Sequence, residues 1–178
     1  LRNIYYLYLS DIQGSENLAL DYLRLCYKYG IDINLAKNNE TIILVDKYCK
    51  RVSGEAHSFT GFVRFKEIGP LSYYSVIEPD HNILPIILRH FTNRFSDQNF
   101  IIHDLKREKA IVYNTKEAII TDLTKEQGEK LSNKIDDSDF ENLWRTFYNS
   151  VNIEERKNHK CRNQHMPRRY WKHLTELQ

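Results

Sequence analysis

A stretch near the end of the chain combines positive charge with aromatic side chains. Residues 156–173 read RKNHKCRNQHMPRRYWKH and contain no carboxylate. The cations of this stretch are Arg156, Lys157, Lys160, Arg162, Arg168, Arg169 and Lys172. Lysine and arginine neutralise phosphates, and aromatic rings such as Tyr170 and Trp171 stack on exposed bases. The stretch therefore predicts a nucleic-acid contact. A solvated basic helix, with Tyr170 and Trp171 packed on the core, is the alternative interpretation.

A second group of reactive side chains lies at residues 55–65, which read EAHSFTGFVRF. Glu55 and His57 offer a carboxylate and an imidazole for proton transfer, and the guanidinium of Arg64 suits an anion. The spacing alone does not fix their geometry. Glu55 paired with a neighbouring cation, beside a surface or capping His57, is the competing interpretation.

A third group spans a predicted helix and the strand after it. His90 and Arg94 stand four residues apart and share one helical face, whereas His103 and Asp104 point to opposite faces of a regular strand. Arg107 follows directly. This group predicts either an anion-binding face or ordinary solvated charges.

Several classes of chemistry lack their motif in this sequence. His159, Cys161 and His165 are offset by two and four residues, which matches no common zinc finger, so no metal site is predicted. No P-loop, GxGxxG, GxSxG or HExxH motif occurs, and no cofactor is predicted. The chain has only 3 cysteines, which fits a reducing cytoplasm better than a disulfide framework.

The elements that position these groups follow from hydrophobic periodicity and capping signals. The periodicity predicts helices over residues 15–30, 42–59 and 82–95, with more helices starting near residues 124, 138, 153 and 167. Alternating patterns predict strands at 61–68, 72–78, 100–106, 109–114 and 117–123. The predicted fold class is α+β: a five-stranded antiparallel sheet with an inserted helix, flanked by N- and C-terminal helices.

Length and composition set the domain organisation. The 178 residues are 41% hydrophobic, which suits one core and predicts a single domain over residues 1–178, truncated at its N-terminus because it begins at Leu1. Residues 138–178 are predicted to form a helical, basic subregion. The net charge of +2 is distributed unevenly along the chain. Outside the basic stretch with its seven cations, the chain has 26 − 7 = 19 cations and 24 anions. No apolar run approaches the roughly 18 residues that span a bilayer, so no membrane partner is predicted.

Several long stretches resemble a known bacterial family. They are EAHSFTGFVRF, PDHNILPIILRHFTNRF, IIHDLKREKAIVYN and MPRRYWKHLTE. The family, named "probable DNA metabolism protein", is of unknown function and is the companion of a putative DNA modification or repair radical SAM protein. Some of its members are fused to a uracil-DNA glycosylase-like domain. The resemblance implies a DNA-associated role and a radical SAM partner, but no established active site. Ser58 departs from the family pattern, in which arginine follows the histidine.

Together these observations predict a DNA-binding or DNA-processing accessory protein. The residues expected to contact phosphate are Arg156, Lys160, Arg162, Arg168 and Arg169, with Tyr170 or Trp171 stacking or packing and Arg64, Arg94 and Arg107 extending the surface. One alternative is an enzyme acting on nucleic acid through Glu55, His57 and Asp104, with Arg64 and Arg94 as anion clamps. A second is a protein interaction module that docks on the radical SAM partner without touching DNA.

Overall fold

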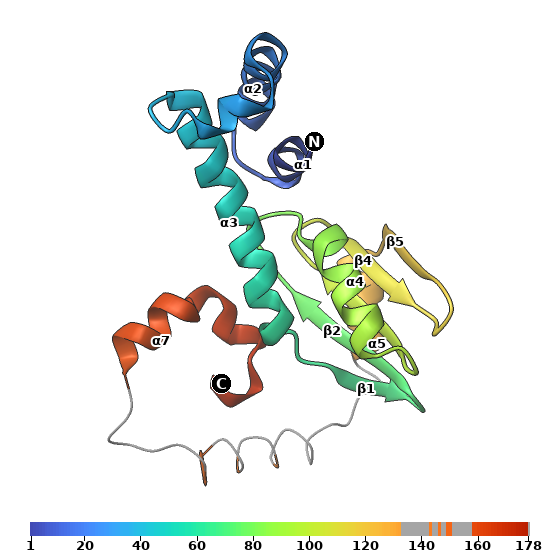
Figure 1. The fold of residues 1–178 in the computed structure, drawn as a ribbon. Helices are drawn as coiled ribbons and strands as arrows, with labels where there is room; N and C mark the ends of the chain where they lie inside the picture. The colour runs from blue at the N-terminus through green and yellow to red at the C-terminus, as the bar shows by residue number, and fades with distance from the viewer. Residues whose placement is uncertain (133–142, 144–145, 147–148, 151–157, 178) are drawn as a thin grey trace. The chain divides into compact units, whose positions relative to one another are not determined.

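The computed structural model describes residues 1–132, 143, 146, 149–150 and 158–177, and these form two compact units (Figure 1). The first unit contains Leu1–His57 and Pro79–Ile83, and the second contains Ser58–Glu78 and Leu84–Gln178. The boundary falls inside one helix, α3 (Glu40–Phe62). The single domain over residues 1–178 stays a prediction. Arg156 and most of the helix predicted from residue 138 lie outside the described residues.

The first unit is helical. It contains α1 (Arg2–Leu9), α2 (Ser15–Tyr29), the short 3₁₀ helix η1 (Ile31–Leu35) and the first part of α3. Gly30 ends α2 with φ at 72°, a left-handed value that favours glycine. At the start of α3, the side chain of Asn39 accepts a hydrogen bond from the backbone N–H of Ile42 at 3.3 Å. The helix predicted over residues 15–30 is therefore confirmed, together with its glycine stop.

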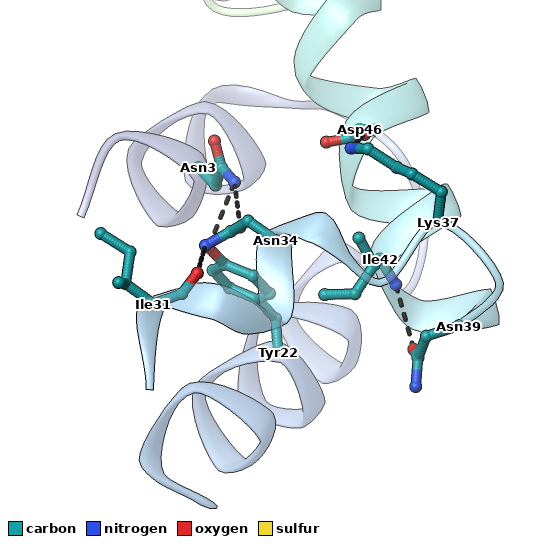
Figure 2. A network of polar contacts seen from close by, with 8 residues as sticks. All are labelled: Asn3, Tyr22, Ile31, Asn34, Lys37, Asn39, Ile42 and Asp46. Atoms are coloured by element: carbon teal, nitrogen blue, oxygen red, sulfur yellow. Dashed lines mark hydrogen bonds and ion pairs between the residues drawn. The ribbon is translucent and has the colours of Figure 1, made fainter. Parts of the chain in front are cut away.

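One apolar cluster of the first unit is bordered by a polar network (Figure 2). Its buried residues are Leu7, Tyr22, Ile33, Ile42 and Val45, and Leu9, Val52, Ala56 and Ile83 of the same unit are buried as well. The Tyr22 hydroxyl donates to Oδ1 of Asn34 at 2.8 Å, and Nδ2 of Asn3 donates to the same hydroxyl at 3.2 Å. Burial raises the pKa of Tyr22. The network thus connects α1, α2 and η1 through polar atoms that are hydrogen-bonded to one another.

The second unit is built on a five-stranded sheet with the strands in chain order. The strands are β1 (Lys66–Gly69), β2 (Ser72–Ile77), β3 (Asn99–Asp104), β4 (Lys109–Tyr113) and β5 (Ala118–Asp122). Helix α4 (Leu84–Arg94) is inserted between β2 and β3, which confirms the predicted α+β class and inserted helix. The sheet is mixed rather than wholly antiparallel, because β2 and β3 pair in parallel while the other pairings are antiparallel. The reason is that α4 carries the chain back to the end where β2 began.

Aromatic rings fill the space between α4 and the sheet. Phe91 and Phe95 of α4 lie 6.4 and 6.3 Å from the ring of Phe100 on β3, and Phe65 lies 5.8 Å from it. These ring separations are typical of edge-to-face packing in a protein core. One face of the sheet is thereby covered.

The opposite face receives α5 (Lys125–Ser132). The capping box predicted at its start is confirmed, since Thr124 and Gln127 exchange side-chain to backbone hydrogen bonds of 3.3 and 2.9 Å. Gly128 of α5 approaches the sheet so closely that an added Cβ would lie 2.5 Å from the Tyr74 hydroxyl and 2.6 Å from Nδ1 of His103. Only glycine permits this approach.

The chain ends in three short helices: α7 (His159–His165), η3 (Arg168–His173) and η4 (Thr175–Leu177). The helix predicted to open at Pro167 is present as the 3₁₀ helix η3. Asn158 caps α7, because its side chain accepts the backbone N–H of Cys161 at 2.9 Å. None of the helices that the structure describes is long and apolar enough to cross a membrane.

Candidate nucleic-acid interface

The C-terminal basic segment, defined here as residues 158–173, is anchored to the core of the second unit. Tyr170 is only 4% exposed, and its ring lies 4.9 Å from Phe59 and 5.8 Å from Phe62. Leu174, directly after the segment, is fully buried. Tyr170 therefore packs on the core in this structure and does not present its ring to solvent.

Two carboxylates reinforce this anchor. Glu176 receives a two-pronged ion pair from Arg64, with Nε donating to Oε2 at 3.2 Å. Glu78 pairs with Lys172, and Nε2 of His173 lies 3.4 Å from Oε1 of Glu78. Burial by itself would raise the pKa of Glu78, but the neighbouring Lys172 and His173 outweigh it and hold the pKa below its usual value. Arg64 and Lys172 are thus neutralised within the unit.

Two other cations of the segment, Arg162 and Arg168, lie against an indole ring. Cζ of Arg162 lies 4.7 Å from the ring centre of Trp171, and Cζ of Arg168 lies 5.6 Å from it. The indole is oriented by its own hydrogen bond, which Nε1 donates to the carbonyl of Met166 at 2.9 Å. Lys160 stands on α7, exposed to solvent. In the described part of the chain, none of the three cations forms an ion pair with a carboxylate.

This arrangement suits phosphate recognition. Cation–π contacts hold a guanidinium over a ring without using its N–H donors, which stay directed to other acceptors. Arg162 and Arg168 thus present fixed guanidinium groups, and Nη2 of Arg162 also lies 3.2 Å from Nδ1 of His159. Trp171 is half-buried and serves as the platform for the two guanidinium groups.

The remaining predicted phosphate contacts differ in their surroundings. Arg169 is exposed, and its guanidinium lies over the Tyr170 ring while Nη2 donates to the Tyr170 hydroxyl at 2.8 Å. Arg94 is exposed at the end of α4, with Cζ 5.7 Å from the ring of Phe95. Arg107 is held by Asp104, to which Nη1 donates at 2.7 Å. The arginines predicted to contact phosphate therefore differ in their exposure and in their hydrogen-bond and ring partners.

Asp104 closes the turn between β3 and β4. Oδ1 accepts the backbone N–H groups of Lys106 at 3.0 Å and Arg107 at 3.3 Å, and Oδ2 accepts the Arg107 guanidinium. The residue is fully buried, and burial raises its pKa against the opposing effect of Arg107. Both carboxylate oxygens are therefore used in holding the turn.

Glu55 performs a related task in the first unit. Its two carboxylate oxygens accept the successive backbone N–H groups of Asp80 and His81, each at 2.8 Å. His57, two residues further along α3, is exposed. Glu55 and His57 belong to the first unit, while Asp104, Arg64 and Arg94 belong to the second. The three predicted acid–base residues thus do not lie within a single unit.

Of two buried histidines, His81 was not predicted as a candidate residue, and His103 was predicted only as part of an anion-binding or solvated group. His81 is 8% exposed, and its Nδ1 accepts the backbone N–H of Asp11 at 3.4 Å. Nε2 of fully buried His103 donates to the Leu123 carbonyl at 2.9 Å, so Nδ1 accepts from the Tyr74 hydroxyl at 2.7 Å. Burial lowers the pKa of His103. The Pro79-Asp80-His81 sequence was the available signal for His81, whereas nothing local indicated the partners of His103.

Among the residues that the structure describes, no group of three or more histidine, cysteine, aspartate or glutamate side chains is arranged to hold a metal ion. Burial raises the pKa of Cys49 to about 11, which keeps its thiol protonated.

Comparison with known proteins gives one match. The model of a domain family of unknown function, DUF4130, matches residues 13–176. No curated protein and no solved structure matches the chain.

Proposed function

This chain belongs to DUF4130, a domain family of unknown function, and from that premise we propose that it is a DNA-binding or DNA-processing accessory protein of DNA metabolism or repair. The sequence resemblance to the "probable DNA metabolism protein" family supports this proposal. So does the fusion of some of those proteins to a uracil-DNA glycosylase-like domain. We place the protein in the cytoplasm, where its free cysteines Cys26, Cys49 and Cys161 would stay reduced.

The observation that carries the proposal is the pair of guanidinium groups held against Trp171, with the exposed Lys160 in the same segment. Lys160, Arg162 and Arg168 have no carboxylate partner among the described residues, although the same segment pairs Lys172 with Glu78. A merely solvated basic segment gives no reason for two guanidinium groups to be held against one ring. Phosphates of DNA are the ligands that such fixed, unpaired cations bind.

Salt-dependent DNA binding tests the proposal. Each phosphate contact contributes about 0.9 to the slope of log affinity against log salt for duplex DNA. The full chain carrying Lys160→Ala, Arg162→Ala and Arg168→Ala should lose roughly 2.7 from that slope. The charge-matched control carries Lys116→Ala, Lys125→Ala and Lys130→Ala, all exposed positions of the second unit. An unchanged slope in the first variant would contradict the proposal.

A second candidate function, a protein interaction module, is supported by a different surface. Leu20, Leu23 and Tyr27 lie on one face of α2 and are 52%, 48% and 97% exposed. We propose the radical SAM protein as the partner. Co-purification that survives nuclease treatment, and that is lost when these three residues are changed to serine, would support direct docking.

The proposal does not include catalysis. An enzyme using Glu55 and Asp104 would need a carboxylate available to substrate. Both oxygens of Glu55 accept backbone N–H groups, and Asp104 accepts backbone N–H groups at Oδ1 and the Arg107 guanidinium at Oδ2. DNA contact requires only the cations. We therefore assign these two carboxylates to the support of the fold.

A further inference from the structure

The solvent-facing side of α3 in the first unit has cations that the proposed function does not use. Lys47, Lys50, Arg51 and Gly54 follow the i, i+3, i+4, i+7 spacing that places residues on one helical face. All four positions are exposed. We call Lys47, Lys50 and Arg51 the α3 basic face.

This charge is not neutralised by the surrounding structure. In the described part of the chain, none of the three cations forms an ion pair. The nearest carboxylates in the sequence are engaged elsewhere: Asp46 pairs with Lys37, and Glu55 accepts the backbone of Asp80 and His81. Three positive charges therefore stand together on one and a half turns of helix.

The surface beside these cations is hollowed. Lys47 and Lys50 line a shallow depression together with Ile43 and with the Lys37–Asp46 ion pair that Figure 2 shows. A hollow bordered by ammonium groups lets an anion approach several of them at once. The depression thus adds shape to the charge of the α3 basic face.

Gly54 continues the face, and the fold gives no reason for a glycine there. A Cβ at this position would meet no atom within 4 Å, and the backbone does not adopt a left-handed φ. Glycine in a helix interior lowers helix stability relative to alanine. The missing side chain leaves room for another molecule to approach the helix backbone next to Arg51.

We infer that the α3 basic face is a second phosphate-contact site, which binds the backbone of the nucleic acid whose binding is proposed above. Helical rise separates Lys47 from Lys50 and Arg51 by about 4.5 to 6 Å along the helix axis, which is on the scale of the spacing between adjacent phosphates of one strand. Insertion into a membrane is disfavoured, because the apolar side of α3, including Ile42, Val45 and Val52, is buried in the protein. The inference rests on the proposed function but uses residues of the other unit.

Salt titration of DNA binding separates this site from the C-terminal one. The full chain with Lys47→Ala, Lys50→Ala and Arg51→Ala should lose about 2.7 from the duplex salt slope, so that raising salt fourfold weakens it about 40-fold less than wild type. The control is again Lys116→Ala, Lys125→Ala and Lys130→Ala, which removes equal charge. The exchange of Lys47 and Lys50 for arginine should retain the wild-type slope.

A substitution at Gly54 separates binding from folding. Gly54→Gln should raise the melting temperature, because the site is open and glutamine favours helix. It should also weaken DNA binding severalfold, because the new side chain occupies the space beside Arg51. Weaker DNA binding by a more stable protein supports the inference. Unchanged DNA binding would contradict the close approach of DNA to the helix backbone at Gly54.

The outcomes distinguish this inference from the proposed function. If the C-terminal variant loses slope and the α3 variant matches the control, the inference is overturned and the proposed function stands. If the α3 variant alone loses slope, the inference stands and the C-terminal assignment is wrong. If wild type shows no salt-dependent binding of DNA, both fail. Binding of polyglutamate or of phosphatidylserine vesicles that requires the α3 cations, without any effect on DNA, would assign the face to an acidic protein or a membrane and overturn the inference.

Discussion

The two compact units differ in how they treat their polar and apolar side chains. The second unit buries polar pairs such as Tyr74 with His103 and Asp104 with Arg107, and it also buries the Ser75 hydroxyl, for which the described residues supply no hydrogen-bond partner. The first unit is smaller, yet it contains 11 of the 15 large apolar side chains that the structure exposes, the other four being Leu71, Ile119, Ile120 and Leu143. Soluble surfaces seldom gather so many without a binding purpose.

This difference in buried polar groups and exposed apolar side chains indicates that the two units are stabilised, and would bind other molecules, in different ways. The second unit completes its own core and presents cations at one edge, around Trp171. The first unit depends on polar anchors such as the buried Glu55, and it exposes apolar residues of α2 and the α3 basic face to solvent. Four substitutions or changes of condition can break or sharpen this contrast.

The largest expected effect is the loss of the Glu55 anchor. Glu55→Ala leaves the N–H groups of Asp80 and His81 without their carboxylate acceptor, which should cost about 3 kcal/mol of unfolding free energy. Urea denaturation, with hydrogen exchange read separately in residues 1–57, measures the loss. Glu55→Gln keeps one acceptor oxygen and should lie between wild type and alanine. A change below about 0.5 kcal/mol in the alanine variant would show that the anchor is dispensable.

A smaller effect is expected in the second unit from Gly128→Ala. The added methyl group would meet the Tyr74 hydroxyl and the His103 ring at 2.5 to 2.7 Å, and such overpacking costs about 2 kcal/mol. The matched control is Gly54→Ala in the first unit, where the space is open and stability should rise by about 0.5 to 1 kcal/mol. Thermal melts of both variants give the comparison. Equal shifts would mean that α5 does not approach the sheet this closely.

Acidification should lower the unfolding free energy of the second unit progressively with falling pH. Burial lowers the pKa of both His103 and His173 below that of an exposed histidine. Below pH of about 6.5 the unfolded chain therefore binds more protons than the folded one, and stability falls with pH by at most about 1.4 kcal/mol per pH unit for each group. Asp104, whose pKa burial raises, acts in the opposite direction over the pH range that extends upward from the ordinary aspartate pKa of about 3.9 to its raised value.

Denaturation midpoints at pH 7.5, 6.5 and 5.5 measure this dependence. A midpoint that is constant or rises on acidification would contradict the neutral, buried His103. The His103→Gln variant should be less stable than wild type at pH 7.5. Its denaturation midpoint should fall less steeply between pH 7.5 and pH 5.5, because one of the two titrating groups has been removed.

The smallest effect on stability should come from the exposed face of α2. Serine at Leu20, Leu23 and Tyr27 removes apolar surface that already faces water, so each change should alter stability by no more than about 0.5 kcal/mol. Urea denaturation checks this expectation beside the loss of partner binding predicted above. A large destabilisation would show instead that the face is packed within the protein and is not a docking surface.

Much of the fold could be predicted because its signals are local. Hydrophobic spacing predicted α2 and α4, and the Thr124–Gln127 capping box predicted the start of α5. The parallel pairing of β2 with β3 was missed because it depends on the path of the chain through α4. Short turns determine the direction of neighbouring strands, whereas a helical crossover reverses that rule.

The candidate site could be predicted only as a region. The composition of residues 156–173 indicated cations and aromatic rings together, but not which cations are neutralised. That depends on partners far away in the sequence: Arg64 pairs with Glu176 across 112 positions, and Lys172 with Glu78 across 94. The α3 basic face was missed for a related reason, because Lys47, Lys50 and Arg51 meet on one face only once the helix has formed.

Lysine footprinting of the full chain, with and without a DNA duplex at low salt, tests the central claim most directly. Acetylation of Lys160 should slow when DNA is bound, while Lys125 and Lys130 on α5 should react at their original rates. Slower acetylation of Lys47 and Lys50 would indicate that the α3 basic face also contacts the bound DNA. Equal reactivity of Lys160 in the presence and absence of saturating DNA would contradict the account.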